Sequence, residues 1–398
     1  MKKNFRSLII FSIILVFSLL LNSTSTYAFQ NNSYVLNDED LTKINENIKK
    51  LLSSKYESMK TLESINVSNI IEDPKLSELI DKNNKFFIEL TKKAGAKVDN
   101  YTSVVNIDNL EQKSNDTFIA NVSYSVEFKL SNSEVLSKSG SEKYRVELTS
   151  NNGDWYINKL LDLHTDIDNT SILEEENKIE TRSITNITSN IDFPNYENTL
   201  DTKITTINNV SNNIDEYYEN LTIKPEITIP KNYSLNTRSA STYSGYNRFG
   251  AVEYAHKWAD GRNPEYKDFG NVDCTNFVSQ CAYEGGGIPS RSIPPAWTPA
   301  KKNDMIVAKA WTSVNEFYDF MTSMGYASSP PDGVKHGDLG DIIQFYNASK
   351  SDYTHAAIIT KMDDIGMYYS AHSNNRYDYP IWLAFDGTYT NIRLIKFW

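Results

Sequence analysis

The chain of 398 residues contains only two cysteines, Cys274 and Cys281, so a fold held together by disulfides is excluded. It also has no surplus of positive charge, because 40 Lys and Arg face 51 Asp and Glu, for a formal net charge of −11. Non-specific nucleic-acid binding depends on basic side chains that neutralise phosphates, so we expect no nucleic-acid partner. After residue 28 the sequence has no apolar run long enough to span a bilayer, so no transmembrane segment is expected there.

The first 28 residues have the organisation of a secretory signal peptide. Three basic residues precede an apolar run at 8–21, and the small residues Thr26 and Ala28 stand at the −3 and −1 positions of a cleavage site. The alternative, an uncleaved membrane anchor, would need a longer apolar run. We therefore expect a secreted, extracellular protein.

The composition changes near residue 240. Of the 16 glycines, 13 follow residue 244, as do both cysteines, four of the five histidines and five of the six tryptophans. Functional sites are commonly built on turn-rich segments of this kind. We expect three regions after the signal peptide: an accessory domain at 35–162, a linker at 163–243 and a catalytic domain at 244–398.

Residues 35–162 have the pattern of a small α+β domain. Apolar residues recur at helical spacing in two segments within 38–95, and the period changes to two over 117–130 and 142–149. Two helices followed by a curved antiparallel sheet resemble the cystatin-like fold. Because this region has no cysteine, and the histidine nearest to it, His164, stands two residues past its end, we interpret it as a non-catalytic accessory domain. A small-ligand pocket is the alternative.

Residues 163–243 are rich in Asn, Thr and Ser and contain no glycine. Apolar spacing allows one helix at 201–222, and Pro225 and Pro230 then introduce a stretch typical of a linker.

The first cysteine stands where a reactive thiol is expected. The sequence predicts a helix over 246–258, a break at Asn263-Pro264, and a second helix from about Asp273 to Tyr283 that ends at a run of glycines. Cys274 would lie in the first turn of this second helix. Free N–H groups there would lower the thiol pKa from ~8.5 towards ~3.5–7.5 and could hold an oxyanion.

A histidine opens a predicted strand at 353–360, which is followed by a turn at 363–366 and a partner strand. If residues 363 and 366 close a hairpin, His355 lies opposite Asn374, and His372 lies opposite Ala357 on the same face. A nucleophilic Cys274, a basic His355 and a polar group that orients the base would form a catalytic triad.

At this point the sequence resembles a known family, the bacterial "putative amidase domain", which belongs with CHAP-type enzymes to the papain-like cell-wall peptidases. The resemblance covers about residues 244–398. The matching motifs are Y-N-R-x-x-A-V-x-Y-A-x-x-W from Tyr246, N-P-x-Y from Asn263, D-C-T-N-F-V-S-Q from Asp273, H-x-x-I-I-T from His355 and S-A-H from Ser370.

The resemblance implies a papain-like α+β fold with Cys274 as nucleophile, His355 as base and His372 in the third position, with Asn374 close behind. The sequence departs from the papain pattern because no oxyanion glutamine precedes the cysteine. The backbone N–H of Cys274 would then be one oxyanion donor, and Tyr266 is a candidate for the other.

Other residues have less reactive interpretations. Asp273 and Trp297 are candidates for the substrate cleft, although Asp273 fits a helix N-cap better. Cys281 is expected in the core. A disulfide with Cys274 is not expected, because seven residues of helix separate the two cysteines by about 10.5 Å, beyond the ~7 Å limit of a disulfide. The same separation argues against a shared zinc ion. We expect no metal and no organic cofactor.

These features together predict a secreted cysteine amidase or endopeptidase that acts on a peptide substrate, in particular the amide bonds of peptidoglycan at the cell-wall surface. The alternative is a non-catalytic cell-surface binding module with a vestigial triad. A third possibility is acyl transfer to an amine, for which the sequence offers no acceptor site.

Overall fold

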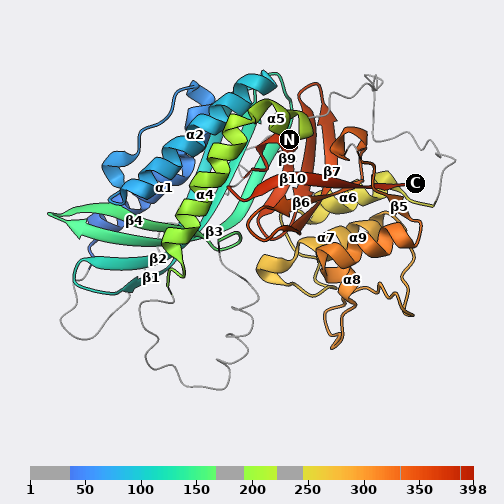
Figure 1. Ribbon diagram of the computed structural model, residues 1–398. Coiled ribbons are helices and arrows are strands. Elements are labelled where there is room, and N and C mark those ends of the chain that lie inside the picture. The colour runs from blue at the N-terminus through green and yellow to red at the C-terminus, as the bar shows by residue number, and fades with distance from the viewer. Residues whose placement is uncertain (1–35, 167–191, 222–244, 332, 386) are drawn as a thin grey trace, which may run out of the picture. The chain divides into compact units, whose positions relative to one another are not determined.

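The computed structural model describes residues 36–166, 192–221 and 245–398, apart from residues 332 and 386 (Figure 1). The predicted signal peptide at 1–28 and much of the 163–243 segment lie outside these ranges. The described chain combines helices with an antiparallel sheet, which confirms the α+β class. Within these ranges, no helix has the length and apolar content needed to cross a membrane.

Two helices come first, where the apolar spacing predicts them. They are α1 (Asp38–Thr61) and α2 (Pro74–Ala94). Asn37 and Asp40 form a reciprocal capping box at the start of α1, with Asn37 Oδ1 accepting from Asp40 N at 2.9 Å. Asp73 caps α2 by accepting from Lys75 N at 2.8 Å, directly before a proline at the first helical position. The start of each helix is therefore encoded locally.

Ten strands form the sheet. They are β1 (Val98–Gln112), β2 (Thr117–Leu130), β3 (Leu136–Asn151), β4 (Asp154–Asp162), β5 (Ala327–Ser328), β6 (Ile342–Asn347), β7 (Asp352–Asp363), β8 (Gly366–Ala371), β9 (Asn375–Pro380) and β10 (Tyr389–Phe397). Their order is β1-β2-β3-β9-β8-β7-β6-β10-β5, with β4 also paired to β3. The strands of the N-terminal region thus continue into those of the C-terminal region.

The two regions join where β3 pairs with β9. Ser139 lies opposite Arg376 in this antiparallel ladder. The Arg376 guanidinium forms an ion pair with Glu142 Oε1 at 2.9 Å, and the two side chains are 13% and 8% exposed. Glu142 also accepts hydrogen bonds from Ser139 and from the Tyr144 hydroxyl. A buried charge needs such partners, so this cluster fixes one region against the other.

Two further helices lie in the segment expected to be a linker. They are α4 (Tyr196–Asn212) and α5 (Ile214–Leu221). They cover the range of the single helix expected at 201–222, but α4 begins five residues earlier and a break falls at Asn213. The α4 helix contacts α2, and α5 contacts β10.

The helices of the C-terminal region cover one face of its strands. They are α6 (Arg248–Trp258), α7 (Cys274–Gln280), α8 (Lys309–Thr312) and α9 (Val314–Ser323), with short helical turns η2 (Gly270–Val272), η3 (Cys281–Gly285), η4 (Gly333–His336) and η5 (Ile381–Leu383). Buried Phe277 and Phe317 from the helices join Ile342, Ala356 and Ile358 of the sheet in one apolar core. The buried face of α7 packs on this core.

Two glycines let α6 cross η3 at very short range. A Cβ atom on Gly250 would lie 2.3 Å from the Gly285 carbonyl oxygen, and one on Gly285 would lie 2.2 Å from that of Gly250. No side chain fits in this space, so the crossing requires glycine on both elements. It fixes α6 against the continuation of α7.

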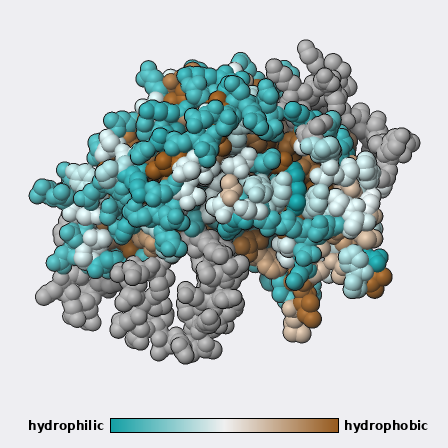
Figure 2. Space-filling model, viewed as in Figure 1, coloured by the Kyte–Doolittle hydropathy of each residue, from teal (hydrophilic) through white to brown (hydrophobic). Residues whose placement is uncertain are grey.

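Hydrophilic side chains cover most of the face shown in Figure 2. The most exposed large apolar residues are Met305 and Ile306, which lie with the half-exposed Ile293 in the loop between η3 and α8.

The Glu142–Arg376 pair gives a stability prediction. We expect Glu142→Gln to lower the free energy of unfolding by about 3–5 kcal/mol, because it leaves the Arg376 charge buried without a carboxylate. Asp81→Asn is the matched control, since Asp81 pairs with Lys85 at the surface and such pairs contribute at most about 1 kcal/mol. Urea denaturation of the full chain measures both values, and equal losses for the two variants would contradict the prediction.

Candidate active site

The candidate nucleophile begins α7 and contacts β7. Cys274 is 5% exposed, and its Sγ lies 3.8 Å from Thr275 Oγ1. The backbone N–H of Ala356, in β7, lies near enough to the sulfur to lower its pKa. The sulfur therefore lies beside the residue that follows His355 in the strand.

The environment of Cys274 differs from the expectation of a lowered pKa. Burial raises the pKa of the thiol, and the charge of Asp273 raises it further, whereas hydrogen bonds from Ala356 and Thr275 lower it. Burial outweighs these bonds because it removes the thiolate from water, and the pKa is raised overall. The expectation of a thiolate stabilised by the helix start is wrong for this arrangement, in which Cys274 is a neutral thiol.

The candidate base lies on β7 with its ring in an aromatic environment. The His355 ring is 5.5 Å from that of Phe345 and 5.9 Å from that of Tyr389, centroid to centroid. Burial lowers the pKa of His355 well below its usual value, and the nearby His164 and Arg376 lower it further. His355 is therefore neutral, as a general base must be before it accepts a proton.

The structure places Cys274 beside β7, the strand that carries His355, with no hydrogen bond between the two side chains. His355 Nδ1 is buried and has no hydrogen-bond partner among the described residues. Successive residues of a strand point to opposite faces, and Ala356 faces the helix core while His355 faces Phe345 and Tyr389. Catalytic hydrogen bonds are often long before substrate binds, so this geometry leaves His355 as the candidate base.

The β7–β8 hairpin has a different register from the expected one. The turn closes as predicted, with Asp363 opposite Gly366, but a β-bulge at Thr360 shifts the ladder so that Ile358 lies opposite Ser370. A shift of one residue exchanges the two faces of a strand. The expected pairing of His355 with Asn374, and of His372 with Ala357, is therefore wrong, and the ladder ends before either pair.

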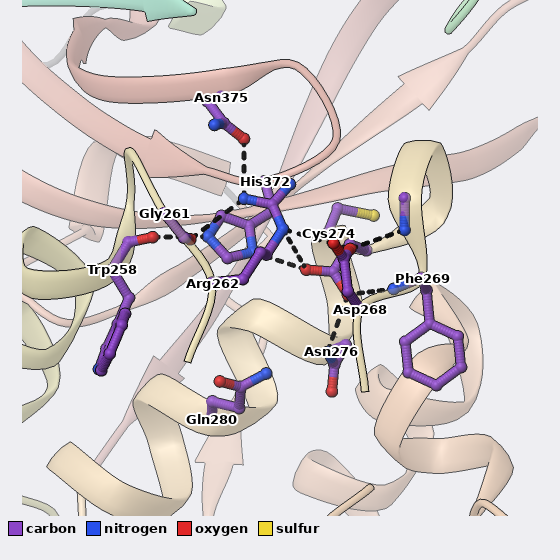
Figure 3. Close-up of polar contacts among 12 residues, drawn as sticks. Trp258, Gly261, Arg262, Asp268, Phe269, Cys274, Asn276, Gln280, His372 and Asn375 are labelled. Atoms are coloured by element: carbon purple, nitrogen blue, oxygen red, sulfur yellow. Dashed lines mark hydrogen bonds and ion pairs between the residues drawn. The ribbon is translucent and has the colours of Figure 1, made fainter. Parts of the chain in front are cut away.

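Both ring nitrogens of His372 are engaged elsewhere. Nδ1 lies 2.6 Å from Asp273 Oδ2, and Nε2 lies 2.8 Å from the Trp258 carbonyl oxygen (Figure 3). The ring also stacks on Phe277 of α7, and the sulfur of Cys274 points away from it. The doubly protonated ring would satisfy both acceptors, but burial opposes that charge and lowers the pKa of His372. In this arrangement, His372 orients the segment before Cys274 and does not orient His355.

Asp273 is the centre of this network and does not cap the helix. Its carboxylate is completely buried and makes no side-chain capping bond to α7, although it occupies the N-cap position. It accepts from Asn276 Nδ2 at 2.8 Å and from the backbone N–H of Phe269 at 3.1 Å, and it pairs with Arg262 at 3.3 Å. Asp273 thus holds the expected N-cap position, but its side chain does not cap the helix. It does not line a cleft either, because its carboxylate is buried among these partners.

Asn374 is the third-position candidate that lies near His355. Both residues line the same small cavity, together with Arg376 and Tyr389. The space inside is about 20 Å³, enough for about one water molecule. Of the two candidates from the sequence, Asn374 is thus the one with access to the His355 side of the sheet.

Tyr266 and Trp297 lie in the core beneath α7. The Tyr266 hydroxyl donates to Glu284 in η3, and its ring stacks on Trp311. Trp297 is completely buried and donates its indole N–H to Ser279 Oγ at 3.2 Å. Tyr266 is therefore not an oxyanion donor in this structure, and Trp297 does not line a cleft.

The backbone N–H of Cys274 remains a candidate oxyanion donor. The first intrahelical bond of α7 runs from Phe277 N to the Asp273 carbonyl oxygen. N–H groups before this point have no acceptor within the helix. Cys281, as expected, is a free buried thiol in the core, and within the described residues no group of three or more metal-ligating side chains is gathered.

One residue near the site was not identified from the sequence. His164 follows β4 in the N-terminal region, and its ring lies edge-on to that of His355 with 5.4 Å between centroids. Its Nδ1 lies 3.2 Å from the carbonyl oxygen of Asn271, three residues before Cys274. Burial lowers the pKa of His164 to about 4. A lone histidine in a region without other reactive residues gives no signal of such a contact.

Comparison with known proteins gives a family for the C-terminal region. Residues 245–395 match the model of the family described as "Putative amidase domain", which confirms the resemblance found in the sequence. Uncharacterized protein YjcM of Bacillus subtilis (strain 168) is 30% identical over 158 residues, 37% of this chain and 36% of that protein. Uncharacterized protein YhbB of the same organism is 29% identical over 120 residues, 30% of this chain and 38% of that protein.

The chain thus spans little more than a third of the length of these curated relatives. The family match supports a generic amidase for residues 245–395.

The Asp273 network predicts that His372 contributes more to stability than Asn374. His372→Gln should lower the free energy of unfolding by about 1–3 kcal/mol, because it removes a hydrogen bond from a buried carboxylate. Asn374→Ala, on the cavity wall, should cost less than about 1 kcal/mol. Urea denaturation distinguishes the two, and a larger loss for Asn374→Ala would show that the roles are reversed.

Proposed function

We propose that residues 245–395 form a cysteine-dependent amide hydrolase with Cys274 as nucleophile and His355 as base. One observation carries this proposal: α7, which begins at Cys274, packs against β7, which carries His355, and His355 offers a neutral ring with an unpartnered Nδ1. Nucleophilic catalysis by a thiol requires a base within reach that can take its proton. The match to an amidase family supports the same reaction class.

The resting pair is a thiol and a neutral imidazole, so the proton moves during attack. His355 Nδ1 takes the proton as Sγ bonds to the amide carbonyl carbon, and the carbonyl oxygen becomes an oxyanion facing the backbone N–H of Cys274. His355 then protonates the leaving amine, the C–N bond breaks, and an acyl-enzyme remains. Water, deprotonated by His355, releases the acid and restores the thiol. In this mechanism Asn374 orients His355.

We also propose the finer features of the fold. A cysteine at the start of a helix that packs on an antiparallel sheet, with the histidine on a strand, is consistent with a papain-like arrangement. Two helices against a four-stranded antiparallel segment are consistent with a cystatin-like accessory region at 35–162.

The proposed substrate is a peptide, in particular an amide bond of the peptidoglycan stem or cross-bridge. The signal-peptide pattern of residues 1–28, and the resemblance of the C-terminal sequence to papain-like cell-wall peptidases, support this choice. The protein would then act outside the cell, at the cell-wall surface. The bond could be a muramoyl–alanine amide or a peptide bond, because the same chemistry cleaves both.

A non-catalytic binding module is the second candidate. It is favoured by the burial of both Cys274 and His355 and by the missing hydrogen bond between their side chains in the described structure.

Digestion of purified peptidoglycan by the full chain tests the proposal. We expect new soluble fragments with the native protein and none with Cys274→Ala, because the nucleophile is lost. Cys281→Ala is the matched control and should retain activity, since this thiol lies in the core. Fragment masses identify the bond that is cleaved. Equal release by the native protein and Cys274→Ala would refute a cysteine mechanism, and no release by either would favour the binding module.

The lowered pKa of His355 predicts the acid side of the pH profile. A base must be neutral to act, and lowering its pKa extends the neutral form to lower pH. The acid limb of kcat/KM should therefore lie below the ordinary histidine value of ~6.5. The exposed His336 provides a control, because His336→Ala should leave the limb unchanged. A limb at or above pH 6.5 would show that the base of the active form does not have the buried environment of His355 in this structure.

A further inference from the structure

A turn of the N-terminal region reaches the candidate active site. His164 comes from outside the segment that matches the amidase family, yet its ring lies against His355, and its Nδ1 lies within hydrogen-bond distance of the Asn271 carbonyl oxygen. It therefore contacts the candidate base and the segment that leads to the candidate nucleophile. These contacts come from two different elements of the C-terminal region, β7 and η2.

The turn that carries His164 is held in a defined conformation. Asp162 Oδ1 accepts from His164 N at 2.8 Å, and Asp166 Oδ2 accepts from Asp162 N at 2.8 Å. Lys203 of α4 pairs with Asp166 Oδ1 at 2.5 Å. We call residues 162–166 the His164 turn. The Asp166–Lys203 pair binds the end of this turn to α4.

The site is closed while the His164 turn is in place. Cys274 and His355 are each 5% exposed. The cavity that His355 lines with His164 and Arg376 is about 20 Å³, room for about one water molecule and not for a peptide amide. A substrate carbonyl must approach within about 3–3.5 Å of the nucleophile to react. In this conformation, no peptide group fits into the cavity beside His355.

The closure depends on how the two regions are joined. Arg376 forms one wall of the cavity and also pairs with Glu142 of β3, so the wall belongs to the junction between β3 and β9. The His164 turn follows β4, which pairs with the same β3. Movement of the turn away from His355 is therefore possible without breaking the β3–β9 ladder, since the turn lies beyond the end of β4.

We propose that the His164 turn is an autoinhibitory plug that covers His355, holds the segment leading to Cys274, and lowers the activity of the enzyme until the turn is displaced. This inference rests on the proposed function for its consequence in hydrolysis. The contact of the His164 turn itself affects only how easily a reagent reaches the Cys274 thiol. Access can be measured without any substrate.

Alkylation of Cys274 in the full chain tests the plug directly. Iodoacetamide modifies a buried thiol only when the protein opens locally, so the rate reports the population of the open form. Replacing the imidazole removes both contacts of the plug, and we expect His164→Ala to raise the Cys274 rate by about tenfold or more at pH 8. Mass spectrometry of peptides measures Cys274 and Cys281 in the same sample.

Cys281 is the internal control for unfolding, because it is completely buried in the core. In His164→Ala it should stay as slow as in the native protein. His336→Ala is the matched histidine control, and should alkylate Cys274 at the native rate. If His164→Ala modifies Cys274 at the native rate or more slowly, with Cys281 protected, the plug is refuted.

Asp162→Asn provides a second variant if His164→Ala exposes Cys281 as well. It keeps the shape of the side chain but weakens the hydrogen bond that fixes the backbone of His164. We expect a faster Cys274 reaction with Cys281 protected. A native Cys274 rate in this variant would likewise refute the plug.

Hydrolysis by the same variants separates the two proposals. If His164→Ala is both alkylated faster and more active on peptidoglycan than the native protein, plug and amidase are both supported. Faster alkylation without hydrolysis by any variant would support the plug and refute the proposed function. Hydrolysis with unchanged alkylation would support the amidase and refute the plug.

Discussion

The carboxylate of Asp273 lies completely out of contact with water, and the segments around the candidate nucleophile are arranged to meet it. Its partners come from four places in the chain: Arg262 after α6, the Phe269 N–H before η2, Asn276 within α7, and His372 after β8. An unpaired carboxylate in such a position would cost several kcal/mol, so these partners cannot be spared. Since Cys274 is the next residue, the same contacts that neutralise Asp273 also determine where the thiol lies.

The second constraint is the continuity of the sheet. Because β3 pairs with β9, the N-terminal strands extend the C-terminal sheet instead of forming a separate layer, and the end of β4 reaches His355. The buried pair of Arg376 and Glu142 makes this junction expensive to open. The turn that follows β4 is held separately, by hydrogen bonds at Asp162 and by the buried pair of Asp166 and Lys203, so its displacement would not break the β3–β9 ladder. Access to the site can thus change while the regions stay joined.

Local signals account for what could be predicted from the sequence. The capping residues before α1 and α2, the apolar period of two in β2, and the turn at 363–366 each depend on neighbours a few residues away, and each element is present. The family motifs likewise single out Cys274 and His355 as candidates, and the structure packs α7, which begins at Cys274, against β7, which carries His355.

The expectations that failed depended on long-range contacts. A single bulge at Thr360 changes the register between β7 and β8, and no turn residue marks it in the sequence. The hydrogen bond between His372 and Asp273 joins residues that stand 99 positions apart in the sequence. Tyr266 was expected as an oxyanion donor and Trp297 in the substrate cleft, but both rings are buried, where large aromatic side chains contribute most to stability. His164 could not be found because its partner lies in another region.

Burial has opposite effects on the pKa values of the two candidate catalytic groups, and this links access to reactivity. Removing water raises the pKa of the Cys274 thiol and lowers the pKa of His355, so that each group is held in its neutral form. Displacement of the His164 turn would hydrate both groups and remove a neighbour that disfavours charge on His355. The two pKa values would then move towards each other, and transfer of the thiol proton to the imidazole would become easier. The same movement that admits substrate would therefore make the thiol more reactive, without any change in the residues that perform the chemistry.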